Sequence, residues 1–115
     1  MKSFFSLDDA TANYESLRIE LEYAEKDLEV AIENCHKLHQ QHDQAWYTYV
    51  RHATPDNYAR FENALDELHC AHEHYSKVKV NHKLVQCKFK KASKVLKRLQ
   101  KRQERLDAKQ RGEDN

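Results

Sequence analysis

The feature that most constrains the fold is a column of mostly apolar residues in the first half of the chain, spaced alternately by four and three positions. This spacing keeps side chains on one stripe of an α-helix, because the repeat of about 3.5 residues matches one helical turn. The column runs without a break from residue 10 to residue 49, through five heptads. It predicts one long helix whose stripe packs against a second helix. Its members are Ala10, Tyr14, Leu17, Leu21, Ala24, Leu28, Ala31, Cys35, Leu38, His42, Ala45 and Tyr49.

Capping signals predict where two helices begin and where the first ends. Ser6, with Asp9 three residues later, resembles a capping box, and acidic residues suit the positive end of a helix dipole. Thr54 before Pro55 is typical of an N-cap followed by the first helical residue, and a residue that precedes proline disfavours the α conformation. We therefore expect helices over residues 7–53 and 55–108.

A second column with the same period predicts the packing stripe of the second helix. Two consecutive spacings of three, at residues 72, 75 and 78, interrupt its alternation and predict a local stammer. Its members are Tyr58, Phe61, Leu65, Leu68, His72, Tyr75, Val78, His82, Val85, Phe89, Ala92, Leu96, Leu99, Gln103 and Leu106.

The fold class follows from these two helices and a short connection. The chain has 115 residues with one Gly and one Pro, too few turn residues for a sandwich or barrel. We expect an all-α, antiparallel two-helix coiled-coil hairpin forming a single domain over residues 1–115, with frayed ends at 1–5 and 109–115. Residues that face each other then have numbers that sum to about 107. Because a two-helix seam is thin, we also expect docking on a partner or dimerisation into a four-helix bundle.

The charge distribution supports an antiparallel arrangement. Residues 1–53 hold 5 Lys/Arg and 10 Asp/Glu, whereas residues 54–115 hold 15 and 9. Folding back at residue 54 lays the acidic half beside the basic half, and this predicts mutual neutralisation.

Two stretches rich in histidine and cysteine, residues 35–42 and 69–74, raise the question of a metal site. In the hairpin Cys35, His39, His69 and His72 are expected to converge, and thiolate with imidazole suits zinc. The favoured interpretation is that these residues are polar interruptions that set the seam register, with no metal or other cofactor bound. A third interpretation is a pH-sensitive seam that buries His42, His72 and His82 in the neutral form.

Apolar residues off the seam predict an interaction surface for another protein or for a second copy of the chain. A hairpin covers one stripe per helix, so a second stripe that includes aromatic residues is typical of a docking surface. Its members are Ile19, Tyr23, Val30, Ile32, Trp46, Tyr47 and Val50. The predicted function is therefore a non-enzymatic interaction module, such as an adaptor, assembly factor or inhibitor.

The basic C-terminal part of the second helix predicts an alternative function in nucleic-acid binding. Cations that extend past the acidic helix keep their charge and suit a phosphate backbone. The candidates are Lys94, Lys97, Arg98, Lys101, Arg102 and Arg105.

Several other classes of protein are not expected. The sequence has no glycine-rich phosphate loop, no GxSxG and no HExxH, so we expect neither an enzyme nor a small-molecule substrate. It has no apolar run of about 18 residues, and its first residues do not resemble a secretory signal. Three cysteines do not make a disulfide framework, so we expect reduced thiols and a cytoplasmic protein.

Overall fold

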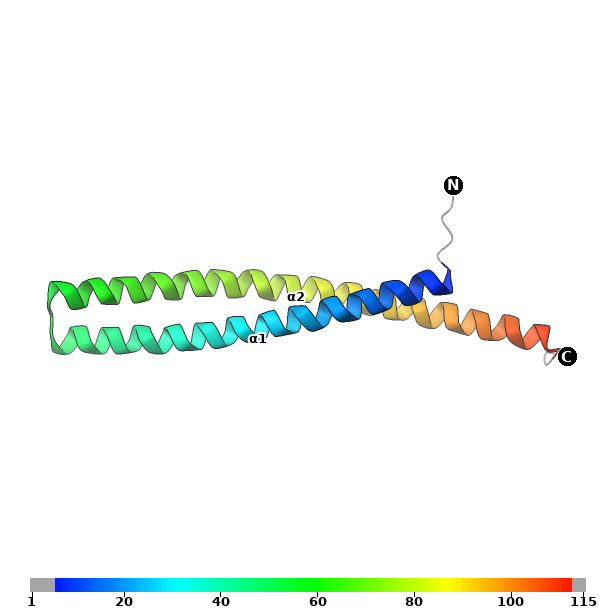
Figure 1. Ribbon diagram of the computed structural model, residues 1–115, viewed down its shortest axis with the longest axis horizontal. Helices are drawn as coiled ribbons and strands as arrows, with labels where there is room; N and C mark the ends of the chain where they lie inside the picture. The colour runs from blue at the N-terminus through cyan, green and yellow to red at the C-terminus, as the bar shows by residue number, and fades with distance from the viewer. Residues whose placement is uncertain (1–5, 113–115) are drawn as a thin grey trace, which may run out of the picture. The chain divides into compact units, whose positions relative to one another are not determined.

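The computed structural model describes residues 6–112 and consists of two long helices with no strand in that range. Helix α1 spans Leu7–Arg51 and α2 spans Pro55–Gln110, joined through residues 52–54. The helices run antiparallel and lie side by side (Figure 1). The predicted all-α hairpin is therefore confirmed. The expected frayed residues 1–5 lie outside the described range, and Lys109 and Gln110 are still helical.

The predicted N-terminal caps are present at both helices. The Asp9 amide donates to Ser6 Oγ at 3.1 Å, and the Ser6 amide donates back to the Asp9 carboxylate at 3.3 Å, a reciprocal capping box. At the second helix the Asn57 amide donates to Thr54 Oγ1 at 3.2 Å. These bonds satisfy amides that have no partner inside a helix, so each cap fixes where its helix begins.

The connection between the helices is longer than expected, because α1 ends two residues before the predicted position, at Arg51. The Asn57 side-chain amide donates to the His52 carbonyl at 2.8 Å, and the Thr54 amide donates to the same carbonyl at 2.8 Å. The start of α2 thus hydrogen-bonds the end of α1. At the other end of α2, Gly112 has φ of 72°, the left-handed conformation that terminates helices and that suits glycine.

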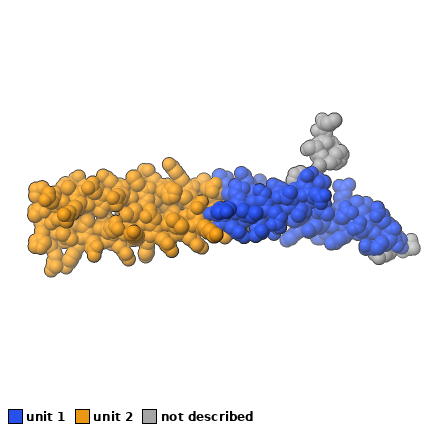
Figure 2. Space-filling model, in the orientation of Figure 1, with its two compact units in different colours: residues 1–23, 83–115 blue, residues 24–82 orange. Residues whose placement is uncertain are grey.

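The chain divides into two compact units, coloured in Figure 2. Ala24–His82 forms one, which we call the turn unit because it contains residues 52–54. Met1–Tyr23 with Lys83–Asn115 forms the other, which we call the terminal unit. Each unit consists of a segment of α1 and a segment of α2.

The seam of α1 is the one that the sequence predicts. All twelve predicted positions are buried or half-buried, and apart from Leu7 every other described residue of α1 is exposed. Ala10, Ala24 and Ala31 retain 1%, 3% and 2% of their exposed surface. An apolar column of heptad period alone was therefore sufficient to identify the packed face of α1.

The seam of α2 differs from the prediction at several positions, and the expected stammer is absent. Ala71 is buried with 6% exposure, whereas the neighbouring His72 is exposed. With Ala64 and Ala71 in the seam, the spacing alternates regularly from Asn57 to Leu99. Three other predicted members are exposed: Tyr58, Gln103 and Leu106. The packed interface takes the smaller side chain, alanine, at this level of the seam, and the imidazole of His72 lies outside it.

Size complementarity explains this choice of residue. Each helix carries one column of mostly small seam residues and one of mostly large residues. The Cys35 thiol donates to the Ala71 carbonyl at 3.3 Å, which sets a register in which facing residue numbers sum to 106 in the turn unit. In this register small residues of one helix face large residues of the other, for example Ala31 opposite Tyr75. Most of the fully buried residues are accordingly alanines, since they lie beneath larger neighbours.

The interpretation of a pH-sensitive seam loses its structural basis. His72 is exposed, and His42 and His82 are half-buried. No polar or charged residue is buried among residues 6–112. None of the three histidines therefore has the burial that this interpretation requires.

Candidate interaction surface

The two sides of the seam differ in character within the turn unit. On one side, which we call the aromatic flank, four of eight positions are apolar and two are imidazoles. Its members are Glu25, Ile32, His39 and Trp46 from α1, and Tyr58, Leu65, His72 and Lys79 from α2. On the other side, the polar flank, all eight positions are polar and exposed. Its members are Asp27, Asn34, Gln41, Thr48, Arg60, Glu67, His74 and Asn81.

Two solvent-open grooves show that each flank is built by both helices. A groove of about 290 Å³ joins Ile32 and His39 of α1 to His72 of α2, with Cys35, His36 and Tyr75 also in its wall. A groove of about 330 Å³ on the polar flank joins Asn34 of α1 to Glu67 and His74 of α2. Apolar and imidazole groups therefore gather on one side of the turn unit. A stripe that includes the seam and one flank is wider than a coiled-coil seam and is typical of helices in a larger bundle.

An aromatic cluster occupies the aromatic flank beside the turn. Phe61 is at its centre: the Trp46 ring lies 5.0 Å from the Phe61 ring, and the His42 ring 5.2 Å from it. The Tyr49 and Tyr58 rings are 5.3 Å apart across the hairpin. These contacts hold Trp46 in place although 48% of it is exposed. Such anchored aromatic side chains lose little conformational entropy when they bind, and they commonly act as binding hot spots.

All seven residues of the predicted interface are exposed, but they do not form one stripe. Ile32 and Trp46 lie on the aromatic flank, and Val50 lies one turn beyond Trp46. Tyr47 instead lines a groove with Gln41, Thr48 and Arg60 of the polar flank. Ile19, Tyr23 and Val30 lie on the face of α1 opposite its seam. Three flank residues, Tyr58, Leu65 and His72, were instead predicted to lie in the seam. Val80 and Leu84 of α2 are also exposed, by 58% and 57%, but the predicted interface contained only residues of α1.

The sequence-derived metal quartet is only partly brought together. Cys35, His39 and His72 share the groove on the aromatic flank, whereas His69 does not line it. All three thiols are free. Cys35 is engaged with the Ala71 carbonyl through its S–H.

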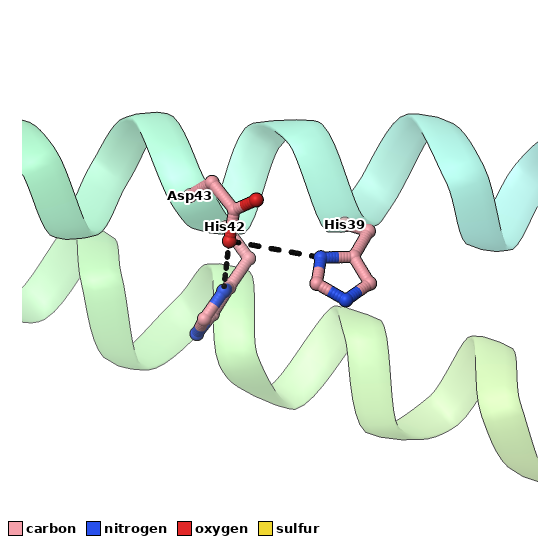
Figure 3. A group of neighbouring side chains, drawn as sticks. All are labelled: His39, His42 and Asp43. Atoms are coloured by element: carbon pink, nitrogen blue, oxygen red, sulfur yellow. Dashed lines mark hydrogen bonds and ion pairs between the residues drawn. The ribbon is translucent and has the colours of Figure 1, made fainter.

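A different set of possible ligands lies closest together among residues 6–112 (Figure 3). This His–Asp trio comprises His39, His42 and Asp43, which lie on the same side of α1 within about one helical turn. Asp43 Oδ1 lies 3.2 Å from His42 Nδ1 and 3.6 Å from His39 Nδ1. The trio offers imidazole and carboxylate ligands of the kind that zinc accepts. His39 and Asp43 are largely exposed, so water competes for the same positions.

Glutamates raise the pKa of two surface groups. The Glu62 carboxylate, one turn further along α2, raises the pKa of Tyr58 because it accepts the hydroxyl hydrogen bond and repels the phenolate. Glu15 hydrogen-bonds Arg18 at 3.1 Å and, with Glu22 at 2.9 Å, raises the pKa of that guanidinium. With these raised pKa values Tyr58 stays a neutral phenol and Arg18 a charged guanidinium at neutral pH.

The basic residues of α2 form an outward face in the terminal unit. Many of them recur every seven residues, for example Lys83, Lys90 and Lys97, and are exposed away from the seam. The six predicted nucleic-acid contacts are all exposed. No ion pair within 4.0 Å joins α1 to α2 among residues 6–112, so the expected neutralisation does not occur through direct pairs. α2 also continues beyond the level at which α1 begins, and there Leu106 is 47% exposed.

Comparisons place no further constraint on these surfaces. Within residues 6–112, neither helix has a stretch long and apolar enough to cross a membrane. The chain matches no protein-family model, no curated protein and no solved structure.

Proposed function

We propose that this chain is a non-enzymatic protein–protein interaction module that docks through the aromatic flank of the turn unit. The observation that carries this proposal is the contrast between the two flanks: four of the eight positions on one flank are apolar or aromatic, whereas all eight on the other flank are polar. The same backbone and the same seam support both sides, so folding of the hairpin alone does not require the difference. Burial of Trp46 and Ile32 against a partner explains why one flank carries apolar residues and the other does not.

Site-specific photo-crosslinking tests this proposal with a matched control. A photoreactive side chain at Ile32 projects from the aromatic flank, and one at Asn34, two residues along the same helix, projects from the polar flank. We expect a covalent adduct from position 32 and none from position 34 when the chain is produced in its native cell. The adduct should weaken when Trp46 is replaced by alanine. Equal adducts from both positions, or none from either, would count against the aromatic flank as a docking surface.

A second candidate function is binding to a nucleic-acid backbone through the basic face of the terminal unit. What favours it is that no ion pair joins the two helices among residues 6–112, which leaves the outward lysines and arginines of α2 available. Phosphate contacts of this kind do not depend on base sequence and weaken steeply with salt, with a slope in log affinity of about −0.9 per contact on duplex DNA.

Anisotropy titrations with labelled DNA and RNA test the second candidate. Reversal of Lys97 to glutamate should weaken binding and reduce the salt slope by about one contact. The control is Lys26→Glu, a charge reversal on the exposed surface of α1. Equal losses in the two variants would indicate an effect of net charge rather than a binding face.

A further inference from the structure

We propose that the partner of the aromatic flank is a second copy of this chain, stacked with both turns at the same end. This inference rests on the proposed function, because it assigns the occupant of the same surface. It requires a two-fold axis parallel to the helices, which places α1 of one copy over α2 of the other. Each helix then runs antiparallel to both of its neighbours, as in many four-helix bundles.

The order of residues along the flank is self-complementary in this arrangement. The axis preserves the level along the helices, so Trp46 meets Tyr58 of the second copy at the end near the turn. In the next layer the imidazole of His39 meets the aliphatic Leu65, and in the layer after that the imidazole of His72 meets Ile32. Aromatic residues thus stack on aromatic residues, and no layer places an imidazole against an imidazole.

Charge complementarity closes the same face at its other end. Glu25 and Lys79 are the last flank residues of the turn unit, and both are exposed. Neither makes an ion pair within residues 6–112, and the Lys79 ammonium lies 5.9 Å from the centre of the Tyr75 ring. In the proposed dimer, Glu25 of each copy faces Lys79 of the other. These two Glu–Lys pairs lie in the layer that follows the apolar layers, one pair at each side of the interface.

The opposite orientation fits the flank less well. If the turns lay at opposite ends, centred on the apolar layers, His39 would face His39 of the other copy. Glu25 would extend beyond the partner's turn, and it would have no cation opposite. The charge pattern therefore favours the orientation with both turns at the same end.

A charge exchange between two variants tests both the partner and the orientation. Glu25→Lys gives two lysines at this layer in each copy, and Lys79→Glu gives two glutamates. We expect each variant alone to show a dimer dissociation constant raised about tenfold in sedimentation equilibrium, the order for two exposed pairs that change sign. An equimolar mixture should recover wild-type affinity as a heterodimer, because every lysine then faces a glutamate of the other copy. If either substitution instead weakened the dimer by disturbing the fold of its own chain, mixing the two variants would not restore the affinity.

Apolar variants supply the second measurement. Ile32→Glu should abolish the dimer, and Val30→Glu, on the opposite face of α1, should not. Both positions are exposed, with 47% and 65% of the residue accessible, so helix content by circular dichroism should stay unchanged in either variant.

The remaining outcomes overturn the inference in distinguishable ways. A wild-type dimer that is insensitive to both charge reversals indicates another orientation. A monomeric wild type whose position-32 adduct has the mass of the chain plus a different protein retains the proposed function but refutes self-association. A monomer with no adduct at position 32 refutes both.

Discussion

Replacing Ala71 with leucine tests the register of the seam, on which the assignment of the two flanks depends. Ala71 is 6% exposed, and its carbonyl accepts the Cys35 thiol at 3.3 Å, so its methyl group lies against α1. Leucine adds an isopropyl group at a position filled by the opposite helix. Overpacking of this kind costs about 1–3 kcal/mol. For a domain of roughly this size, a loss of about 2 kcal/mol lowers the melting temperature by about 8–16 °C.

The matched control is His72→Leu at the adjacent position. The stammered seam that the sequence predicted places residue 72 inside, so leucine there would fill the seam and stabilise the hairpin. The structure exposes His72, so we expect a change of no more than about 0.5 kcal/mol. Thermal and denaturant unfolding by circular dichroism, at a concentration where the chain is monomeric, measures both variants. A neutral Ala71→Leu together with a stabilising His72→Leu would falsify the register and the flank assignment with it.

Three further predictions concern the helix start, a surface tyrosine and metal binding. Ser6→Ala removes the capping box and should cost about 1 kcal/mol, seen as faster hydrogen exchange of the Asp9 amide; unchanged exchange would contradict it. Glu62→Gln should lower the Tyr58 pKa in an ultraviolet titration of the phenolate. Because Glu62 raises that pKa in the folded state, the stabilisation is present below the ordinary tyrosine value of about 10 and is lost as pH rises through the raised value, so the variant should lack this alkaline loss. Zinc chelation should leave the unfolding midpoint unchanged, since the His–Asp trio is exposed and lies on one helix; a drop with chelator, together with stoichiometric zinc in the purified protein, would establish a metal site.

Local signals were sufficient for the helices and their starts. The Ser6 and Thr54 caps act within three or four residues, and the heptad column of α1 repeats within two helical turns, so both are properties of short sequence windows. The end of α1 was placed two residues too late. That boundary depends on bonds from the start of α2 to the His52 carbonyl, which form only once the chain has turned.

The candidate surface was predicted only in part. Exposure of Ile32 and Trp46 followed from their position off the seam, and the structure confirms it. Their alignment with Leu65 and His72 on one flank was not foreseen, because it requires the rotation of α2 about its own axis. That rotation decides whether Ala71 or His72 faces α1, since adjacent residues point about 100° apart around a helix.

The sequence by itself determined that two long amphipathic helices form, where they start, and that they fold back at Pro55. The physical reason is that period, capping and turn chemistry act between neighbours in the chain. The tertiary structure alone decided which of two adjacent residues enters the seam, and hence which side chains share a flank. That decision depends on small side chains of one helix fitting beneath large ones of the other, and neither helix carries this information alone. The contrast between the aromatic and polar flanks, and the docking surface proposed from it, follow from that fit.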